Sequence, residues 1–229
     1  MNQPTSHRGY RFPPAIISHA VWLYFRFGLS VRDVEDLLAE RGVTVTDETI
    51  RQWCLTLGLE YARRRRGRLG DTWYLDEVFV TIQGRQQYLW RAVDEDGDVI
   101  DRLVQSRRNR LAAERFFRTL SKGQGHTPRR LITDKLGSYS AAHRTAMPSV
   151  VRCTDQYAKN RAEVSDQPTR QREHQMRRSK SATHAQRFLS VHGLVQNLFR
   201  VGRHVLRPVH HRLLRGQAFQ IWHAVSCAS

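Results

Sequence analysis

The stretch Thr72–Ile82, TWYLDEVFVTI, is rich in aromatic and β-branched residues, which favour a β-strand. Side chains alternate between the two faces of a strand, so Asp76 shares one face with Tyr74 and Val78, and Glu77 points to the other. Burying an unpaired carboxylate is costly, so an acid in a central strand needs a cation or a metal ion beside it. The alternative is a surface strand whose two acids are both solvated.

The strand pattern continues beyond this stretch. Residues 87–93 and 98–105 have a similar composition, and short turns at 83–85 and 94–97 join the segments. Three strands connected in this way form an antiparallel meander. The pattern then predicts a helix, a strand, a helix and a strand, at residues 110–121, 129–134, 137–147 and 149–154. From about residue 160 the chain reads as helical, with a break at 206–208 where Pro208 disfavours continuation.

Upstream of the meander, the sequence predicts three helices, at residues 13–27, 30–42 and 46–58. Ser30 and Thr46 are suited to cap the second and third helices. Two short helices with a polar, basic outer face on the second resemble a helix-turn-helix, whose candidate DNA-binding side chains are Thr49, Arg51 and Gln52. A helical hairpin that only packs against its neighbours remains an equal alternative on this stretch alone.

A run of basic residues, YARRRRGRLG at 61–70, separates the helices from the strands. Its four consecutive arginines are Arg63, Arg64, Arg65 and Arg66. A solvated linker would have this composition. Beside a helix-turn-helix, contact with DNA phosphates is the favoured interpretation.

The overall charge indicates a polyanionic partner. Among 229 residues, 38 are Lys or Arg and 21 are Asp or Glu, which gives a formal charge of +17 and a pI of about 11.0. Nucleic acid is the leading candidate. The apolar runs are too short to cross a membrane and the N-terminus lacks a secretory signal, so we expect a cytoplasmic, nucleoid-associated protein without a membrane partner.

Cysteine and histidine spacing argues against a structural zinc site. Cys54, Cys153 and Cys227 are odd in number and far apart, and the eleven histidines form no HExxH motif. A disulfide framework is disfavoured for the same reason.

Three acidic residues lie at notable positions relative to the predicted strands and helices. Asp76 lies in the first strand, Asp134 ends a later strand, and Glu163 lies near the start of a helical segment. Each has an ordinary explanation taken alone: Asp134 as a helix cap, and Glu163 or the nearby Asp166 as acids that favour a helix N-terminus. Taken together, in a β-β-β-α-β-α-β-α order, they predict a ribonuclease H-like α/β fold with three carboxylates at one site.

Such a set of hard oxygen ligands suits Mg²⁺ or Mn²⁺. Two of these ions would activate a water or a 3′-hydroxyl and stabilise the leaving oxygen in a displacement at phosphorus. The prediction also explains acids in a basic chain. Arg and Lys hold the DNA backbone, while the metal ions neutralise the carboxylates and the phosphate.

Three segments of the chain resemble the catalytic blocks of DDE insertion-sequence transposases, nearest the IS-six family: YLDEVFVTIQGRQQYLWRAVDEDGDVID, LITDKLGSYSAA and NRAEVSDQPTRQREHQMRRSKSATHAQRFLSVHGLVQNLFR. The upstream segment FRFGLSVRDVEDLLAERGVTVTDETIRQW is similar to that family's helix-turn-helix. The resemblance covers nearly the whole chain. It implies that Asp76, Asp134 and Glu163 are the catalytic, metal-binding acids, and it does not extend this role to Glu77.

The resemblance also implies residues that contact DNA or shape the site. These are Lys135 and Tyr139 after the second acid, and Arg170, Arg172 and Lys180 in the basic block after the third. The chain departs from the family pattern at Val164, where Asn is usual, at Asp166, where His is usual, and at Ser179, where Phe is usual. An acid in place of His would repel phosphate.

These observations divide the chain into a helix-turn-helix at 1–60, a basic linker at 61–71, a ribonuclease H-like catalytic domain at 72–205 and a C-terminal helical segment at 206–229. The expected function is a transposase that binds terminal inverted repeats and catalyses metal-dependent cleavage and strand transfer, as a homo-oligomer that joins two ends. The main alternative is an impaired copy that acts only as a DNA-binding repressor. A ribonuclease or resolvase with the same sheet is a third.

Overall fold

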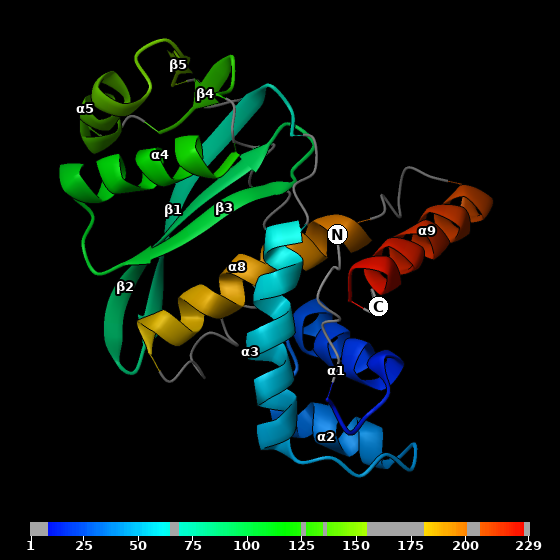
Figure 1. Ribbon diagram of the computed structural model, residues 1–229. Helices are drawn as coiled ribbons and strands as arrows, with labels where there is room; N and C mark the ends of the chain where they lie inside the picture. The colour runs from blue at the N-terminus through cyan, green and yellow to red at the C-terminus, as the bar shows by residue number, and fades with distance from the viewer. Residues whose placement is uncertain are drawn as a thin grey trace. The chain divides into compact units, whose positions relative to one another are not determined.

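The computed structural model describes residues 9–64, 69–124, 127–134, 137–154, 181–200 and 207–226 (Figure 1). The chain forms two compact units. One comprises Met1–Arg65 with Leu194–Ser229, and the other comprises Arg66–Gly193. We call them the helical unit and the sheet unit and describe each by itself.

The helical unit contains the three helices expected from the sequence and one from the C-terminal segment. They are α1 (Pro14–Phe27), α2 (Val31–Ala39), α3 (Asp47–Arg64) and α9 (Pro208–Ser226). No helix among the described residues combines the length and apolarity that a membrane crossing requires.

Both predicted caps are confirmed. The Ser30 hydroxyl accepts a hydrogen bond from the Asp33 backbone N–H, and the Asp33 carboxylate accepts one from the Ser30 N–H, so the two form a capping box. The Thr46 hydroxyl accepts from the backbone N–H of Thr49 at 3.3 Å. Between α2 and α3, Gly42 has a φ of 75°, which suits a residue without a Cβ.

Helix α3 is longer than its sequence pattern suggested. The pattern ended it at Gly58, but the helix continues to Arg64, so residues 61–64 of the expected linker are helical. One interior glycine costs about 1 kcal/mol, and the buried side chains of Ile50, Trp53 and Leu57 offset that cost. Arginine is itself a good helix former, so nothing in residues 59–64 stops the helix.

The C-terminal segment does not stand apart, because α9 packs into the helical unit. The hydroxyls of Ser18 in α1 and Ser226 in α9 are 2.6 Å apart and buried. The ring of Phe219 lies 5.2 Å from that of Trp22 in α1, measured between centroids. The division at residue 206 therefore differs from the division that the structure shows.

The sheet unit is built on a five-stranded mixed sheet. Its strands are β1 (Thr72–Ile82), β2 (Arg85–Asp94), β3 (Val99–Gln105), β4 (Arg130–Ile132) and β5 (Val151–Cys153). Their order is β3-β2-β1-β4-β5, in which the pairs β3–β2 and β2–β1 are antiparallel and the pairs β1–β4 and β4–β5 are parallel. This arrangement confirms the ribonuclease H-like fold class.

The hairpin between β1 and β2 turns at two residues with positive φ. Gln83 has a φ of 52° and Gly84 a φ of 72°, which is the geometry of the tight turn that matches strand twist. This turn fixes the register, in which Asp76 lies opposite Arg91 and Glu77 opposite Trp90.

Helices cover both faces of the sheet (Figure 1). On one face, α4 (Arg110–Gln124) and α5 (Gly137–Ala146) close a core around Trp73, Trp90 and Phe116. On the other face, Ala185 and Leu189 of α8 (Ala182–Phe199) pack against the far half of the β1–β2 hairpin, at Val80, Ile82 and Leu89. The alternation predicted for β1 is confirmed, since its odd and even positions enter different cores.

Helix α8 also occupies the open edge of β3. The Gln186 side chain accepts a hydrogen bond from the Val104 N–H at 2.8 Å and donates one to the Arg102 carbonyl at 2.8 Å. Farther along the helix, a Cβ on Gly193 would come within 2.8 Å of Val99. The side-chain amide thus satisfies edge groups that would otherwise be open to another strand.

Asp101 in β3 makes the stability of the protein depend on pH. Burial raises the pKa of its carboxyl from 3.8 to about 6, although the Arg102 backbone N–H donates to it at 2.7 Å. A raised pKa means that the folded state holds the proton more tightly than the unfolded state. The stability that this proton contributes is complete below pH 3.8 and is lost as the pH rises through about 6.

We expect Asp101→Asn to raise the free energy of unfolding at pH 8 by about 1–3 kcal/mol and to have little effect at pH 3.5. Urea denaturation of both proteins from pH 3.5 to 8 measures the difference between their free energies of unfolding. The contributions of the other titrating groups cancel in that difference. An unchanged difference across the range would contradict the assignment.

Candidate active site

Two of the three predicted acids lie just past the residues at which β1 and β4 pair. Strands β1 and β4 run parallel, and their last paired residues are Tyr74 and Ile132. Asp76 lies in β1 two residues after Tyr74, and Asp134 follows the end of β4 by two residues. Both carboxylates are partly exposed, at 22% and 25%. The two predicted acids therefore lie near the carboxyl end of β4.

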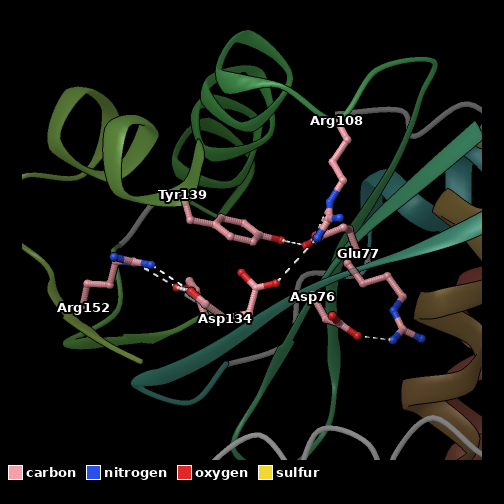
Figure 2. Close-up of polar contacts among 8 residues, drawn as sticks. Asp76, Glu77, Arg108, Asp134, Tyr139 and Arg152 are labelled. Carbon is pink, nitrogen blue, oxygen red and sulfur yellow. Dashed lines mark hydrogen bonds and ion pairs between the residues drawn. The ribbon is translucent and has the colours of Figure 1, made fainter. Parts of the chain in front are cut away.

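Asp76 has the cation that its place in the strand requires. The Arg91 Nη2 of β2 donates to the Asp76 Oδ2 at 2.9 Å, and the arginine side chain is only 6% exposed (Figure 2). Because the two residues are register partners, the pairing follows directly from the hairpin. The ion pair lies on the face of the sheet that α8 covers.

The backbone at Asp134 is fixed by one arginine from β5. Arg152 donates from Nε to the Thr133 hydroxyl at 2.8 Å, from Nη1 to the Ser140 hydroxyl at 2.8 Å, and from Nη2 to the Asp134 carbonyl at 2.9 Å. Arg152 thus links the two residues that follow β4 to helix α5. These contacts leave the Asp134 carboxylate directed toward Arg108 (Figure 2).

Glu77 lies on the opposite face of β1 and is the centre of a buried network. Its side chain is 3% exposed. The Tyr139 hydroxyl of α5 donates to Oε2 at 2.5 Å, and Arg108, which precedes α4, donates from Nε to Oε1 at 2.6 Å. The same guanidinium lies 3.8 Å from the Asp134 carboxylate. Arg108 therefore links the buried glutamate to the second predicted catalytic acid (Figure 2).

The network perturbs two acidic groups. Burial raises the pKa of Glu77, the charge of Asp134 adds to the rise, and the bonds from Tyr139 and Arg108 oppose it. Burial also raises the pKa of Tyr139 well above its usual value, and the nearby carboxylates of Glu77, Asp134 and Asp76 act in the same direction. The phenol therefore stays protonated and remains a hydrogen-bond donor.

Sequence reasoning left out Arg91, Arg108 and Arg152, and it assigned Glu77 no role. Arg91 could have been predicted from the sequence, because a two-residue hairpin turn places it opposite Asp76. Tyr139 was expected to contact DNA or shape the site, and the structure places it in the network around Glu77. Its ring is fully buried, with a relative exposure of 0%.

The donor set is suited to a divalent metal ion. Asp76 and Asp134 offer partly exposed carboxylate oxygens, the ligands that Mg²⁺ and Mn²⁺ prefer. Within the described ranges, no three His, Cys, Asp or Glu residues are grouped so as to hold a metal ion. The third predicted ligand, Glu163, lies outside those ranges. The two aspartates fit part of such a site.

The candidate DNA-binding residues of the helix-turn-helix lie at the start of α3. Arg51 and Gln52 are exposed, and both donate to the Glu48 carboxylate, Arg51 from Nε at 2.7 Å and Gln52 at 2.9 Å. Thr49 is half-buried, and its hydroxyl lies 2.9 Å from that of Thr46. Thr49 thus helps to cap the helix, and the other two present polar groups to solvent.

The structure does not describe the side chains at the remaining predicted positions. Arg63 and Arg64 lie in the last turn of α3. The others lie outside the described residues: Arg65, Arg66, Lys135, Glu163, Val164, Asp166, Arg170, Arg172, Ser179 and Lys180.

The sequence matches a family model described as a DDE domain, over residues 70–202. The match covers more than half of the chain. The chain belongs to the DDE transposase family. The DDE transposase is therefore a polynucleotidyl transferase, and the matched range includes Asp76, Asp134 and Glu163.

Curated relatives point to the same family. The transposase for insertion sequence-like element IS431mec of Staphylococcus aureus strain Mu50 is 31% identical over 166 residues, which are 66% of this chain and 70% of the relative. The S. aureus transposase for insertion sequence element IS257 in transposon Tn4003 is 30% identical over the same shares. These relatives confirm the IS-six type of this DDE transposase.

Solved structures with a similar fold include two retroviral proteins. The HTLV-2 integrase catalytic core domain in complex with magnesium has a TM-score of 0.40 at 12% identity and covers 63% of this chain and 94% of its own. The simian T-cell lymphotropic virus intasome has a TM-score of 0.41 at 13% identity, with 89% and 72% covered. At these scores the likeness adds nothing to what the strand order shows.

Proposed function

We propose that this transposase binds the terminal inverted repeats of its insertion sequence, cuts the DNA to leave a 3′-hydroxyl, and joins that end to target DNA. The observation that carries the proposal is that, in a DDE domain, Asp76 and Asp134 each follow the last paired residues of the parallel strands β1 and β4 by two positions. The main alternative from the sequence is an impaired copy that only binds DNA. It would have the same fold and the same DNA-binding residues but would not cleave or join DNA.

Asp76, Asp134 and Glu163 would hold Mg²⁺ or Mn²⁺, two ions in the complete site. Bound there, the metal would activate a water or 3′-hydroxyl and stabilise the leaving oxygen. Arg91 pairs with Asp76, and Arg108 lies 3.8 Å from the Asp134 carboxylate, so each arginine offsets the negative charge of one aspartate before the metal binds. Arg152 fixes the backbone that carries Asp134, so its carboxylate needs little reorganisation.

The basic surface would hold DNA. The formal charge of +17 favours binding to the phosphate backbone, and the exposed start of α3 would supply side chains for base contact. Two element ends must be joined, so the active complex would contain at least two copies of the chain. Binding to chromosomal DNA would place the protein on the nucleoid.

The test is a strand-transfer assay on labelled DNA that carries the inverted repeat found beside the gene. The proposal expects Mg²⁺-dependent cleavage and joined products. Specific binding without any product in Mg²⁺ or Mn²⁺ would identify the protein as a repressor instead. The Asp166→His variant would then be expected to raise activity, because the resembling family usually has His at this position and an acid there would repel phosphate.

We expect Arg51→Ala to weaken binding to the inverted repeat by about fivefold to a hundredfold, as for loss of one base contact. The matched control is Arg41→Ala, which removes an exposed arginine near the C-terminal end of α2. Fluorescence anisotropy on repeat and scrambled duplexes measures the ratio of the two affinities. An equal loss on both duplexes would show that Arg51 contacts only phosphate.

A further inference from the structure

Phe79 is an exposed aromatic side chain three residues beyond Asp76. Its relative exposure is 55%, although its neighbours Val80 and Ile82 on the same strand are buried. It lies on the part of β1 that continues past the last position paired with β4. Its register partner on β2 is Tyr88, and the two ring centroids are 5.3 Å apart. The hairpin thus presents two adjoining rings on the face of β1 that carries Glu77, opposite to the face that carries Asp76.

Arg108 connects this pair of rings to the site. Its guanidinium carbon lies 5.9 Å from the centroid of Phe79, and its Nη2 lies 3.8 Å from the Asp134 carboxylate. The bonds to Glu77 hold the guanidinium in this place. A ring face, a cation and a catalytic carboxylate therefore lie within the span of one arginine side chain.

We propose that Phe79, flanked by Tyr88 and Arg108, is a stacking site for a base of the DNA next to the phosphate that is cut. Aromatic rings bind bases of any sequence through their faces, and a neighbouring arginine adds a cation for the backbone. A base inside a duplex cannot reach such a ring. The DNA must therefore be unpaired or distorted where it meets the site. This inference rests on the proposed function.

The size of the exposed apolar feature favours a base over a second protein. One phenyl ring exposes a small fraction of the roughly 800 Å² per partner that a stable protein interface buries. A nucleobase, in contrast, is about the size of the ring itself. The charge around the ring also suits a polyanion, because the Glu77 carboxylate is engaged by Arg108 and Tyr139.

The experiment uses the full chain and element-end DNA in which 2-aminopurine replaces single bases on either side of the cleavage position. With Ca²⁺ in place of Mg²⁺, wild-type protein should change the probe fluorescence at one or two adjoining positions. Phe79→Ala should abolish that change and, with Mg²⁺, slow single-turnover cleavage by about 5- to 150-fold. Phe79→Trp should retain both, because it keeps an aromatic face.

The matched control is Leu111→Ala, which removes another exposed apolar side chain of the sheet unit, 72% exposed. It should leave the fluorescence and the cleavage rate unchanged. Thermal unfolding of both variants should match wild type, since neither side chain is buried. A Phe79→Ala protein with wild-type fluorescence and rate would overturn the inference. A change in oligomeric state without a change in fluorescence would overturn it too, and would make Phe79 a protein contact.

These outcomes are separable from failure of the proposed function. Wild-type protein that binds element ends but never cleaves them would refute catalysis, while the fluorescence signal would still test the stacking site. Wild-type protein that cleaves at the same rate as Phe79→Ala would refute only the stacking site.

Discussion

Replacing Asp76 with Asn is expected to slow strand cleavage by about a thousandfold or more. Asn keeps the size of the side chain but removes the negative charge that a divalent metal ion requires, and loss of several kcal/mol of transition-state stabilisation corresponds to that factor. Asp134→Asn should have the same effect, because Asp134 follows the end of β4 by two residues, as Asp76 follows the last β1 residue that pairs with β4. Single-turnover cleavage of labelled element-end DNA in Mg²⁺ measures both.

Asp71→Asn provides the matched control for this prediction. Asp71 is also an aspartate paired with an arginine, with 3.1 Å between its carboxylate and Arg129, but it precedes β1 and is exposed. Its loss should change the cleavage rate less than twofold, in line with the small worth of a surface ion pair. Chelation of the metal should abolish wild-type cleavage and leave repeat binding intact. Cleavage by Asp76→Asn at a rate near that of wild type would exclude Asp76 as a metal ligand.

Replacing Glu77 with Ala is expected to lower the free energy of unfolding by about 2–4 kcal/mol. Loss of one member of a buried ion pair strands its partners, and the partial exposure of Arg108 moderates that cost. Tyr139, which is fully buried, would lose the acceptor of its hydroxyl. Cleavage should also slow by about tenfold or more, because Arg108 would be free to pair more closely with Asp134.

A graded series distinguishes this network from general loss of packing. Tyr139→Phe removes one hydrogen bond and should cost about 0.5–1.5 kcal/mol. Glu77→Gln keeps the shape and one acceptor oxygen, so its loss of stability should fall between those of the other two variants. Urea denaturation at pH 7 gives the free energies. If Glu77→Ala is as stable as wild type, the network does not contribute to the fold.

Much of the sheet unit could be predicted from local sequence. The composition of 72–82 and the turn at Gln83-Gly84 specify the β1–β2 hairpin, since β-branched residues favour strands and the turn needs positive φ. The hairpin register then fixes Asp76 opposite Arg91. The caps at Ser30 and Thr46 are equally local, because each hydroxyl bonds to a backbone group three residues away.

The sequence by itself therefore determined the strands, the caps and the hairpin pair, and its resemblance to a family supplied the prediction of which acids are catalytic. Only the tertiary structure decided which side chains surround them. Glu77 contacts Arg108 and Tyr139 across separations of 31 and 62 residues, and α9 joins α1 through Ser18 and Ser226 across 208. Such contacts depend on how helices close over a sheet or over each other, and local periodicity carries no record of which distant partner a buried group will meet.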